Sequence, residues 1–459
     1  MKDFKLLILF VALVSVLNIQ AQPSTVVTGK RIPAVDKKEM ANEAKEAFLH
    51  AWNSYKTYAW GMDALMPLSK KGHNWYKETL LMTPVDAYDV MMIMGLKKES
   101  SEAKALIFER LRFNIDMDVQ NFEVSIRILG GLLSAYELDG DKRFLELAKD
   151  LGDRLIKSFN SPTGMPYRYV NLVSGKTSGN ISNPAEIGTY IVEYGILSRH
   201  TGDPRYYETA KRAMTALNDR RSPLGLTGSQ IDVETGEWKN TGSHISGGID
   251  SYLEYMLKAG ILFNDKDMTG MWQSSLAAIN KYLADLQPNG FWYGHADMNV
   301  GKITGTHYGS LDAFFAGSLA MAGDMEHAKA LQESNYKMWM LYGIEPEGLD
   351  YSKMEPTWPS YSLRPENLEG AYYLYQYTHD EKYLEMGKDM FKNLVKYCRN
   401  DAGFCALKSV LTMEKDDEME SFFLAETLKY SFLLFDDGKS LDFNKVIFNT
   451  EAHPYRRSK

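Results

Sequence analysis

The sequence predicts an all-α protein of the (α/α)7 barrel class, in which seven helical hairpins close into a ring. Two kinds of helix alternate along the chain. Segments such as 141–150 are charged on one side, whereas segments such as 128–136 are apolar nearly all round. A helix with one wet face is expected outside, and a helix without one is expected inside. The apolar, inner segments are predicted to start near Asp86, Glu123, Glu186, Asp250, Ser310, Glu366 and Glu420.

Spacing favours a closed ring over an open stack. From Glu123 onward, successive inner starts are 54 to 64 residues apart, which is room for two helices and two loops. An open solenoid needs a polar terminal cap, and this chain has none. The count of seven excludes a six-hairpin toroid of the polysaccharide-degrading kind. Longer connections, such as 160–183 and 221–246, contain Gly, Pro and Ser and strand-like pieces (230–233), so we expect functional loops on one face.

The short junctions between inner and outer helices are Gly-Asp or His-Asp pairs. Gly or His can end the inner helix, and Asp is expected to cap the outer helix that follows. The four predicted caps are Asp141, Asp203, Asp324 and Asp380.

The N-terminus is predicted to be an export signal. Lys2 and Lys5 precede an apolar run at 6–17, followed by small residues suited to cleavage after residue 21. This run is too short to span a bilayer. We therefore expect a signal peptide at 1–21, a polar lead-in at 22–37 and one catalytic domain at 38–459. The mature protein is expected to be an exported monomer, periplasmic or secreted, with no membrane span.

Composition narrows the class of protein further. The chain has 459 residues with 44% hydrophobic content, enough for one large core. A net charge of −8 with no basic block excludes a nucleic-acid partner. Cys398 and Cys405 flank a turn and, in an exported protein, could either form a disulfide or remain free. With no further Cys or His at ligand spacing, they do not predict a zinc site.

Carboxylates recur at the starts of the inner helices, often two on one helix face. Acids at helix N-termini commonly act as caps, so for any single acid the alternative to a functional role is that it only caps its helix. Two like charges on one face destabilise a helix, and apolar surroundings increase that cost unless Arg, a cation or ligand hydroxyls compensate. In a closed ring these ends converge on one cavity. The pairs are Asp86 and Asp89, Asp250 and Glu254, and Glu366 and Glu369.

A cavity of this kind suits a neutral, polyhydroxylated ligand such as a sugar. Two acids on opposite sides of a glycosidic bond are also the minimum apparatus for its hydrolysis. The chain has no Gly-x-Ser-x-Gly, phosphate-binding Gly loop or His-Glu-x-x-His. Aromatic rings that could either stack on a sugar or serve helix packing are Phe422, Trp358, Trp292 and Tyr293.

Seven sequence blocks in a fixed order carry a family resemblance. The stronger blocks are 121–136, 248–255, 363–369, 419–430 and the Phe-Asn-Thr-Glu-Ala-His-Pro stretch at 448–454, and the weaker blocks are 83–89 and 184–186. Together they resemble glycoside hydrolase family 47, the class I α-mannosidases, over nearly the whole mature chain. Within it, the ER degradation-enhancing mannosidase-like branch is the most similar, and the export signal suggests a bacterial member.

The resemblance implies calcium-dependent, inverting exo-hydrolysis of terminal α-1,2-linked mannose from glycans or mannobiose, in a barrel plugged by a C-terminal β-hairpin. It implies that Glu123 is the general acid, Glu366 the general base and Asp250 a supporting catalytic residue, and that Thr450 binds Ca²⁺. The alternative is a catalytically silent, lectin-like protein that recognises high-mannose glycoproteins, although both acid and base are present. The implied substrate-binding residues are Arg127, Glu186, Glu254, Arg364, Glu369, Phe422, Glu426 and Glu451.

Two positions depart from the family pattern. Gly309–Ser310 stands where the processing mannosidases have Asp-His, and Gly248 stands where the ER mannosidase has Arg. We expect weaker sugar contacts from the first and relaxed linkage selectivity from the second. The alternative for Gly248 is that it only serves the backbone turn before the inner helix.

Overall fold

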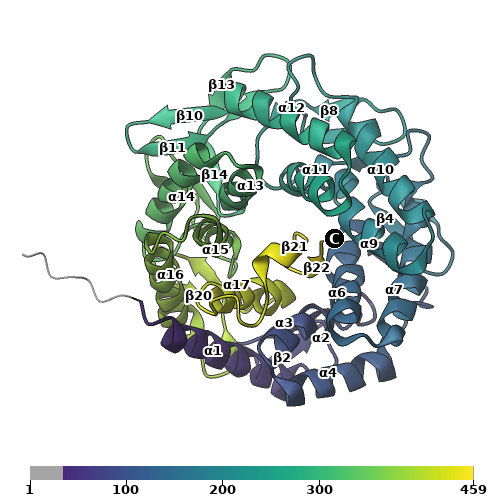
Figure 1. Cartoon of the computed structure of the whole chain (residues 1–459), viewed down its shortest axis with the longest axis vertical. Helices are drawn as coiled ribbons and strands as arrows, with labels where there is room; N and C mark the ends of the chain where they lie inside the picture. The colour runs from purple at the N-terminus through teal and green to yellow at the C-terminus, as the bar shows by residue number, and fades with distance from the viewer. Residues whose placement is uncertain (1–34, 458–459) are drawn as a thin grey trace, which may run out of the picture. The chain divides into compact units, whose positions relative to one another are not determined.

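A computed structural model describes residues 35–457, in which the helices form two concentric rings (Figure 1). The predicted signal peptide and most of the polar lead-in lie outside the described residues. Between residues 35 and 457, no helix combines the length and apolar character that crossing a bilayer requires.

The outer ring consists of seven amphipathic helices. In α7, for example, Phe144, Ala148, Leu151 and Leu155 are buried along one face while the charged residues point outward. The outer helices are α1 (Lys37–Tyr58), α4 (Lys97–Arg110), α7 (Lys142–Leu155), α10 (Arg205–Asn218), α12 (Lys266–Tyr282), α14 (Met325–Met340) and α16 (Lys382–Cys398).

The inner ring has seven positions, which confirms the predicted (α/α)7 barrel. It closes because α1, the first outer helix, packs against α17, the last inner one. Several inner positions are interrupted near their starts. The inner elements are α2 (Met82–Asp86) with α3 (Tyr88–Ile93); α5 (Asn121–Val124), η1 (Ser125–Leu129) and α6 (Gly130–Asp139); α8 (Pro184–Gly188) with α9 (Ile191–Thr201); α11 (Asp250–Phe263); η3 (Leu311–Phe314) with α13 (Phe315–Ala322); α15 (Glu366–Thr378); and η4 (Phe423–Thr427) with α17 (Leu428–Leu433).

Short antiparallel sheets occupy the connections that run from an outer helix to the next inner helix. Because the helices alternate in direction, these sheets gather at the end of the barrel where the inner helices begin, as predicted. The strand-like piece at 230–233 forms β7. The three-stranded sheets are β3 (Asp118–Gln120), β4 (Tyr169–Asn171) and β5 (Thr177–Ser178); β6 (Ile181–Ser182), β7 (Gln230–Asp232) and β8 (Trp238–Asn240); β9 (Gly242–Ser243), β12 (His295–Asp297) and β13 (Ile303–Gly305); and β14 (His307–Gly309), β15 (Gly348–Asp350) and β16 (Glu355–Trp358).

Four further hairpins lie in the same kind of connection. They are β1 (Ala64–Met66) with β2 (Lys71–His73), β10 (Ala284–Gln287) with β11 (Gly290–Tyr293), β17 (Arg399–Asn400) with β18 (Gly403–Phe404), and β19 (Leu407–Ser409) with β20 (Glu414–Lys415). Cys398 and Cys405 flank the β17–β18 hairpin, where the Cys405 amide donates to the Cys398 carbonyl at 2.8 Å. Both thiols are buried and free, so the disulfide alternative is not observed.

Three of the four predicted caps are present at the opposite end of the barrel. Asp141, Asp203 and Asp380 each accept a hydrogen bond from a backbone amide in the first turn of an outer helix. The prediction for Asp324 is wrong, because its carboxylate does not bond the helix amides. It accepts instead from the Asn280 amide at 2.9 Å and pairs with His327 Nδ1 at 2.8 Å.

The final hairpin, β21 (Val446–Phe448) with β22 (Pro454–Arg456), lies inside the inner ring (Figure 1). This confirms the predicted plug. Gly130 and Gly131 of α6 allow its close approach. A Cβ at Gly130 would lie 2.8 Å from the Asn449 side chain, and one at Gly131 would lie 3.3 Å from the His453 ring.

Candidate active site

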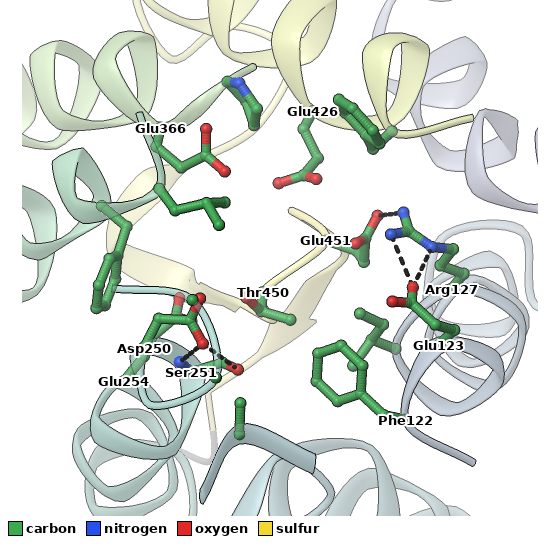
Figure 2. A pocket seen from close by; sticks show the side chains of 18 of the residues that line it. Phe122, Glu123, Arg127, Asp250, Ser251, Glu254, Glu366, Glu426, Thr450 and Glu451 are labelled. Carbon is green, nitrogen blue, oxygen red and sulfur yellow. Dashed lines mark hydrogen bonds and ion pairs between the residues drawn. The ribbon is translucent and has the colours of Figure 1, made fainter. Parts of the chain in front are cut away.

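A cavity of about 260 Å³ lies where the inner helices begin, and all twelve predicted site residues line it. They come from five inner positions and from the tip of the β21–β22 hairpin. Figure 2 shows Glu123 and Glu366 on opposite sides, with Thr450 between them. The twelve are Glu123, Arg127, Glu186, Asp250, Glu254, Arg364, Glu366, Glu369, Phe422, Glu426, Thr450 and Glu451.

The prediction that the acids of every inner helix start meet in this cavity is wrong for the first inner position. Asp86 and Asp89 do not line it, and both are fully buried next to the hairpin. Asp86 Oδ1 lies 3.2 Å from His453 Nε2, and Asp89 Oδ2 lies 2.7 Å from His453 Nδ1. These two carboxylates therefore hold the plug rather than a ligand.

Glu123 is positioned by Arg127, one turn later. A π-helical turn, η1, follows Glu123 directly, and such turns often occur at functional sites. Arg127 Nε and Nη2 lie 3.0 and 2.9 Å from Glu123 Oε2, and Nη1 lies 2.5 Å from Glu451 Oε2 (Figure 2). The Arg127 guanidinium sits 5.1 Å from the Trp75 ring and 5.8 Å from the Phe422 ring. Arg127 thus joins the predicted acid to the hairpin and is fixed by rings on either side.

Glu366 begins α15, and its environment suits a group that accepts a proton near neutral pH. Burial raises the pKa of Glu366 to about 7, against a lowering by the Arg364 charge. Among the residues described, its Oε2 atom has no hydrogen-bond partner. Arg364 is oriented by Glu347, whose two oxygens each lie 3.1 Å from Arg364 Nε. A general base works best when its pKa lies near the working pH.

Asp250 occupies the first position of α11. Burial raises the pKa of Asp250 to about 7, although the Ser251 amide donates to its Oδ1 atom at 2.7 Å. Gly248, two residues earlier, has a φ of +89°, in the left-handed region that side chains rarely adopt. The backbone turn therefore favours glycine here, and the effect of Gly248 on linkage selectivity stays a prediction. The added Cβ would itself meet only ordinary contacts, 3.7 Å from Asn183.

Glu186 is the most fully paired of the acids in the cavity. Its amide is capped by Asn183 Oδ1 at 2.9 Å. Its carboxylate accepts from Arg168 Nε and Nη2 at 2.5 and 2.8 Å and from Gln120 Nε2 at 3.0 Å. Sequence reasoning missed Arg168, because it lies in an irregular connection with no periodic neighbour.

Carboxyl groups from α11, α15, η4 and the hairpin tip crowd together in the cavity. Burial raises the pKa of Glu369 and of Glu451 to about 8. Burial and the neighbouring Glu451 and Glu366 carboxylates raise the pKa of Glu426 well above its ordinary value. Glu254, nearby on α11, forms an ion pair with Lys258. Crowded, buried carboxylates of this kind are stabilised by a cation or by hydroxyl donors.

Thr450 offers two oxygen atoms that could bind a cation, its side-chain hydroxyl and its backbone carbonyl. Within residues 35–457, neither its hydroxyl nor its carbonyl oxygen has a hydrogen-bond partner, and its amide donates to the Tyr255 hydroxyl at 3.2 Å. No three His, Cys, Asp or Glu side chains in this part of the chain are arranged as a metal site. The two Thr450 oxygens, with waters bound by the nearby carboxylates, could hold a hard cation, and such an all-oxygen ligand set is the kind that Ca²⁺ prefers.

Ser310 does not line the cavity. It is fully buried, and its hydroxyl lies 3.2 Å from Glu347 Oε2. Leu311 and Phe314 line the wall in this region instead, which makes it apolar. The predicted loss of a polar contact at Ser310 thus agrees with where its side chain lies.

Of the four aromatic candidates for sugar stacking, only Phe422 lines the cavity. Trp292 and Tyr293 are fully buried and serve packing: Trp292 stacks on Tyr351 at 5.4 Å, and the Tyr293 hydroxyl donates to Asn280 at 2.6 Å. Trp358 is 62% exposed and lies outside the cavity lining. Aromatic composition alone could not show which way these rings face.

Several known proteins are similar to this chain over most of its length. Alpha-mannosidase I MNS5 of Arabidopsis thaliana is 38% identical, across 92% of this chain and 77% of its own length. The human ER degradation-enhancing alpha-mannosidase-like protein 2 is 35% identical, across 92% of this chain and 78% of its own. The solved structure of an alpha-1,2-mannosidase from Trichoderma reesei superposes with a TM-score of 0.85 at 26% identity, covering 92% of this chain and 99% of that one.

The profile of glycosyl hydrolase family 47 matches residues 47–457, which is nearly all of the described barrel and includes every residue that lines the cavity. The alignments with the two sequence relatives just named also cover most of those proteins' own lengths. The chain belongs to glycosyl hydrolase family 47.

Proposed function

We propose that this protein is a calcium-dependent, inverting exo-α-1,2-mannosidase that releases terminal mannose from glycans or from α-1,2-mannobiose. The observation that carries the proposal is the placement of Glu123 and Glu366 on opposite sides of one acidic cavity in a family 47 barrel (Figure 2). The solved Trichoderma reesei relative is an alpha-1,2-mannosidase, which supports the linkage.

In this proposal, Glu123 donates a proton to the glycosidic oxygen, directly or through a water. Glu366 removes a proton from the water that attacks the anomeric carbon from the other face, so the configuration inverts. Asp250 supports the reaction from the wall between them. The β21–β22 hairpin lies inside the inner ring and its tip lines the cavity, so we expect only the end of a sugar chain to enter (Figure 1). This favours removal of terminal residues over internal cleavage.

The remaining polar groups would bind the sugar. Carboxylates and Arg364 exchange hydrogen bonds with hydroxyl groups, while Phe422 offers a ring face. Thr450 would hold Ca²⁺ through its two free oxygens, with Glu254, Glu369, Glu426 and Glu451 binding the waters around it. Bound there, the ion would offset carboxylate charge and bind hydroxyl oxygens of the terminal sugar. We further propose export through residues 1–21 and a monomeric state.

The test is incubation of the purified protein with α-1,2-mannobiose, with and without EDTA, followed by assay of free mannose. We expect mannose release that EDTA abolishes and added Ca²⁺ restores. Full activity after exhaustive chelation would refute the calcium dependence. Binding of mannobiose without release of mannose would refute hydrolysis and support the lectin-like alternative.

A further inference from the structure

The turn that carries Thr450 is held from beneath by two buried lysines. It spans residues 449–452 at the tip of the β21–β22 hairpin. Lys258 Nζ lies 3.2 Å from the Asn449 carbonyl, and Lys429 Nζ lies 2.6 Å from the Ala452 carbonyl. The two lysines thus bind the carbonyl oxygens at both ends of the turn. Thr450, which lies inside the turn, lines the cavity, and among residues 35–457 its hydroxyl and carbonyl oxygens have no hydrogen-bond partner.

The lysines approach from different sides of the barrel. Lys258 lies on α11 and Lys429 on α17, and both are about 1% exposed or less. Each also pairs with a carboxylate, because Lys258 contacts Glu254 and Lys429 Nζ lies 2.8 Å from Asp89. Neither ammonium can move without breaking a buried ion pair, so the two carbonyl positions are fixed relative to the inner ring.

Other bonds define the turn itself. Asn449 Oδ1 accepts from the amides of Glu451 and His453 at 2.9 and 2.8 Å. The Thr450 amide donates to the Tyr255 hydroxyl at 3.2 Å. Ala452 adopts a φ of +56°, which is unusual for a residue with a side chain. A strained residue persists only where its surroundings hold it, and the Lys429 contact to its carbonyl is one such restraint.

Stability alone does not explain two buried ammonium groups. Removing an ammonium from water is costly, and an apolar side chain of similar volume is often as favourable in such a place. Positive charge beneath a cation site also repels the cation, so the lysines do not serve it as charges. What the two lysines contribute to the site is therefore their hydrogen bonds to the carbonyls of the turn.

We propose that Lys258 and Lys429 are positioning residues that fix the 449–452 turn, so that the hydroxyl and carbonyl oxygens of Thr450 face a single Ca²⁺. This rests on the calcium dependence in the proposed function. A positioning role of the two lysines and a purely electrostatic role make opposite predictions for Ca²⁺ binding. Loss of positioning weakens Ca²⁺ binding, whereas loss of a nearby positive charge alone strengthens it.

The test measures Ca²⁺ binding to the chelator-treated full chain by isothermal titration calorimetry, without substrate. We expect Lys258→Met and Lys429→Met each to weaken Ca²⁺ affinity roughly 10–100-fold, as removal of outer partners of metal ligands does. The matched control is Lys104→Met. Lys104 is a partly buried lysine whose Nζ lies 2.6 Å from Asp139 and 3.0 Å from Asp141, with no contact to the turn. The control should bind Ca²⁺ as the wild type does.

Thermal unfolding of each variant verifies that it is folded. If Lys429→Met does not fold, Lys429→Arg, which keeps the charge but alters the reach, should still weaken binding. Equal or tighter Ca²⁺ binding by the folded lysine variants, with normal wild-type binding, would overturn the positioning role alone. No Ca²⁺ binding by the wild type would overturn the proposed calcium dependence together with this inference.

Discussion

His453 joins the hairpin plug to the barrel through a charge that depends on pH. Both ring nitrogens face carboxylates, Asp89 at 2.7 Å and Asp86 at 3.2 Å, and all three side chains are buried. Although burial lowers the pKa of His453, these carboxylates outweigh it and raise the pKa from the ordinary 6.5 to about 9. The folded protein therefore keeps this proton over a range in which the unfolded chain has lost it.

The expected effect follows from that difference. At 1.36 kcal/mol for each pKa step, the charged imidazole contributes about 3 kcal/mol to the free energy of unfolding. Because the folded pKa lies above the unfolded one, this contribution is complete below about pH 6.5. It is lost as the pH rises through about 9. The protein should thus become less stable toward alkaline pH, with the hairpin as the affected element.

The assay compares wild type with His453→Gln by denaturant unfolding at a series of pH values from 6 to 9.5, with Tm as a second readout. Subtracting the two proteins removes most other groups that titrate in this range. Their difference in stability should shrink by about 3 kcal/mol between the ends of the series. The matched control is His200→Gln, which removes a more exposed ion pair. In that pair His200 Nε2 lies 2.8 Å from Glu137, and its loss should change the pH dependence of stability little. A difference that stays constant across the series would refute the reasoning.

Four further predictions concern catalysis and the cavity. Glu123→Gln keeps the shape but removes the proton, so kcat should fall roughly 10²–10⁴-fold while mannose affinity by calorimetry stays near the wild-type value; a parallel loss of affinity would argue for a binding role. An inverting enzyme should have its two carboxyl groups, here those of Glu123 and Glu366, roughly 6.5–9.5 Å apart. Proton NMR of the early product should then show β-mannose, and α-mannose would refute the inverting assignment. Thr450→Ala removes the hydroxyl but keeps the backbone carbonyl, and it should weaken both Ca²⁺ and substrate binding by roughly tenfold or more; an unchanged calcium requirement would exclude the Thr450 hydroxyl as a ligand. Gly248→Ala forces a side chain into the left-handed region and should cost roughly 1–2 kcal/mol of stability in denaturant unfolding, whereas unchanged stability would contradict the backbone role of Gly248.

The ring architecture was predictable because its signal is periodic. Alternation of one-sided and fully apolar helices repeats seven times, and acids mark six of the seven predicted inner starts, although Asp86 and Glu420 do not line the cavity. The interruptions η1 and η4 were not predictable, because one inserted residue in a helical turn leaves no mark in a hydrophobic pattern. η1 nevertheless begins two residues after Glu123 and η4 contains Glu426, so both interruptions lie beside the cavity.

The missed contacts that hold the hairpin join residues that lie far apart in sequence. His453 and Asp89 are 364 positions apart, and Lys258 and Asn449 are 191 apart. Local periodicity cannot report such pairs. Lys258 did carry a local signal, since it follows Glu254 by one helical turn, but an exposed helix face would look the same in sequence.

The place of the hairpin in the chain also has a consequence for biosynthesis. Residues 446–456 follow all fourteen ring positions, and the first of these, α1, needs α17, the last, to close the ring. During translation, a nascent barrel therefore has an open seam and no Thr450 or Glu451 in its cavity. Its acidic groups can be assembled only when this late segment inserts along the axis. Under the proposed mechanism, catalytic competence thus requires the insertion of residues 446–456, and a chain cut short before residue 450 would carry both Glu123 and Glu366 but lack the proposed calcium ligand.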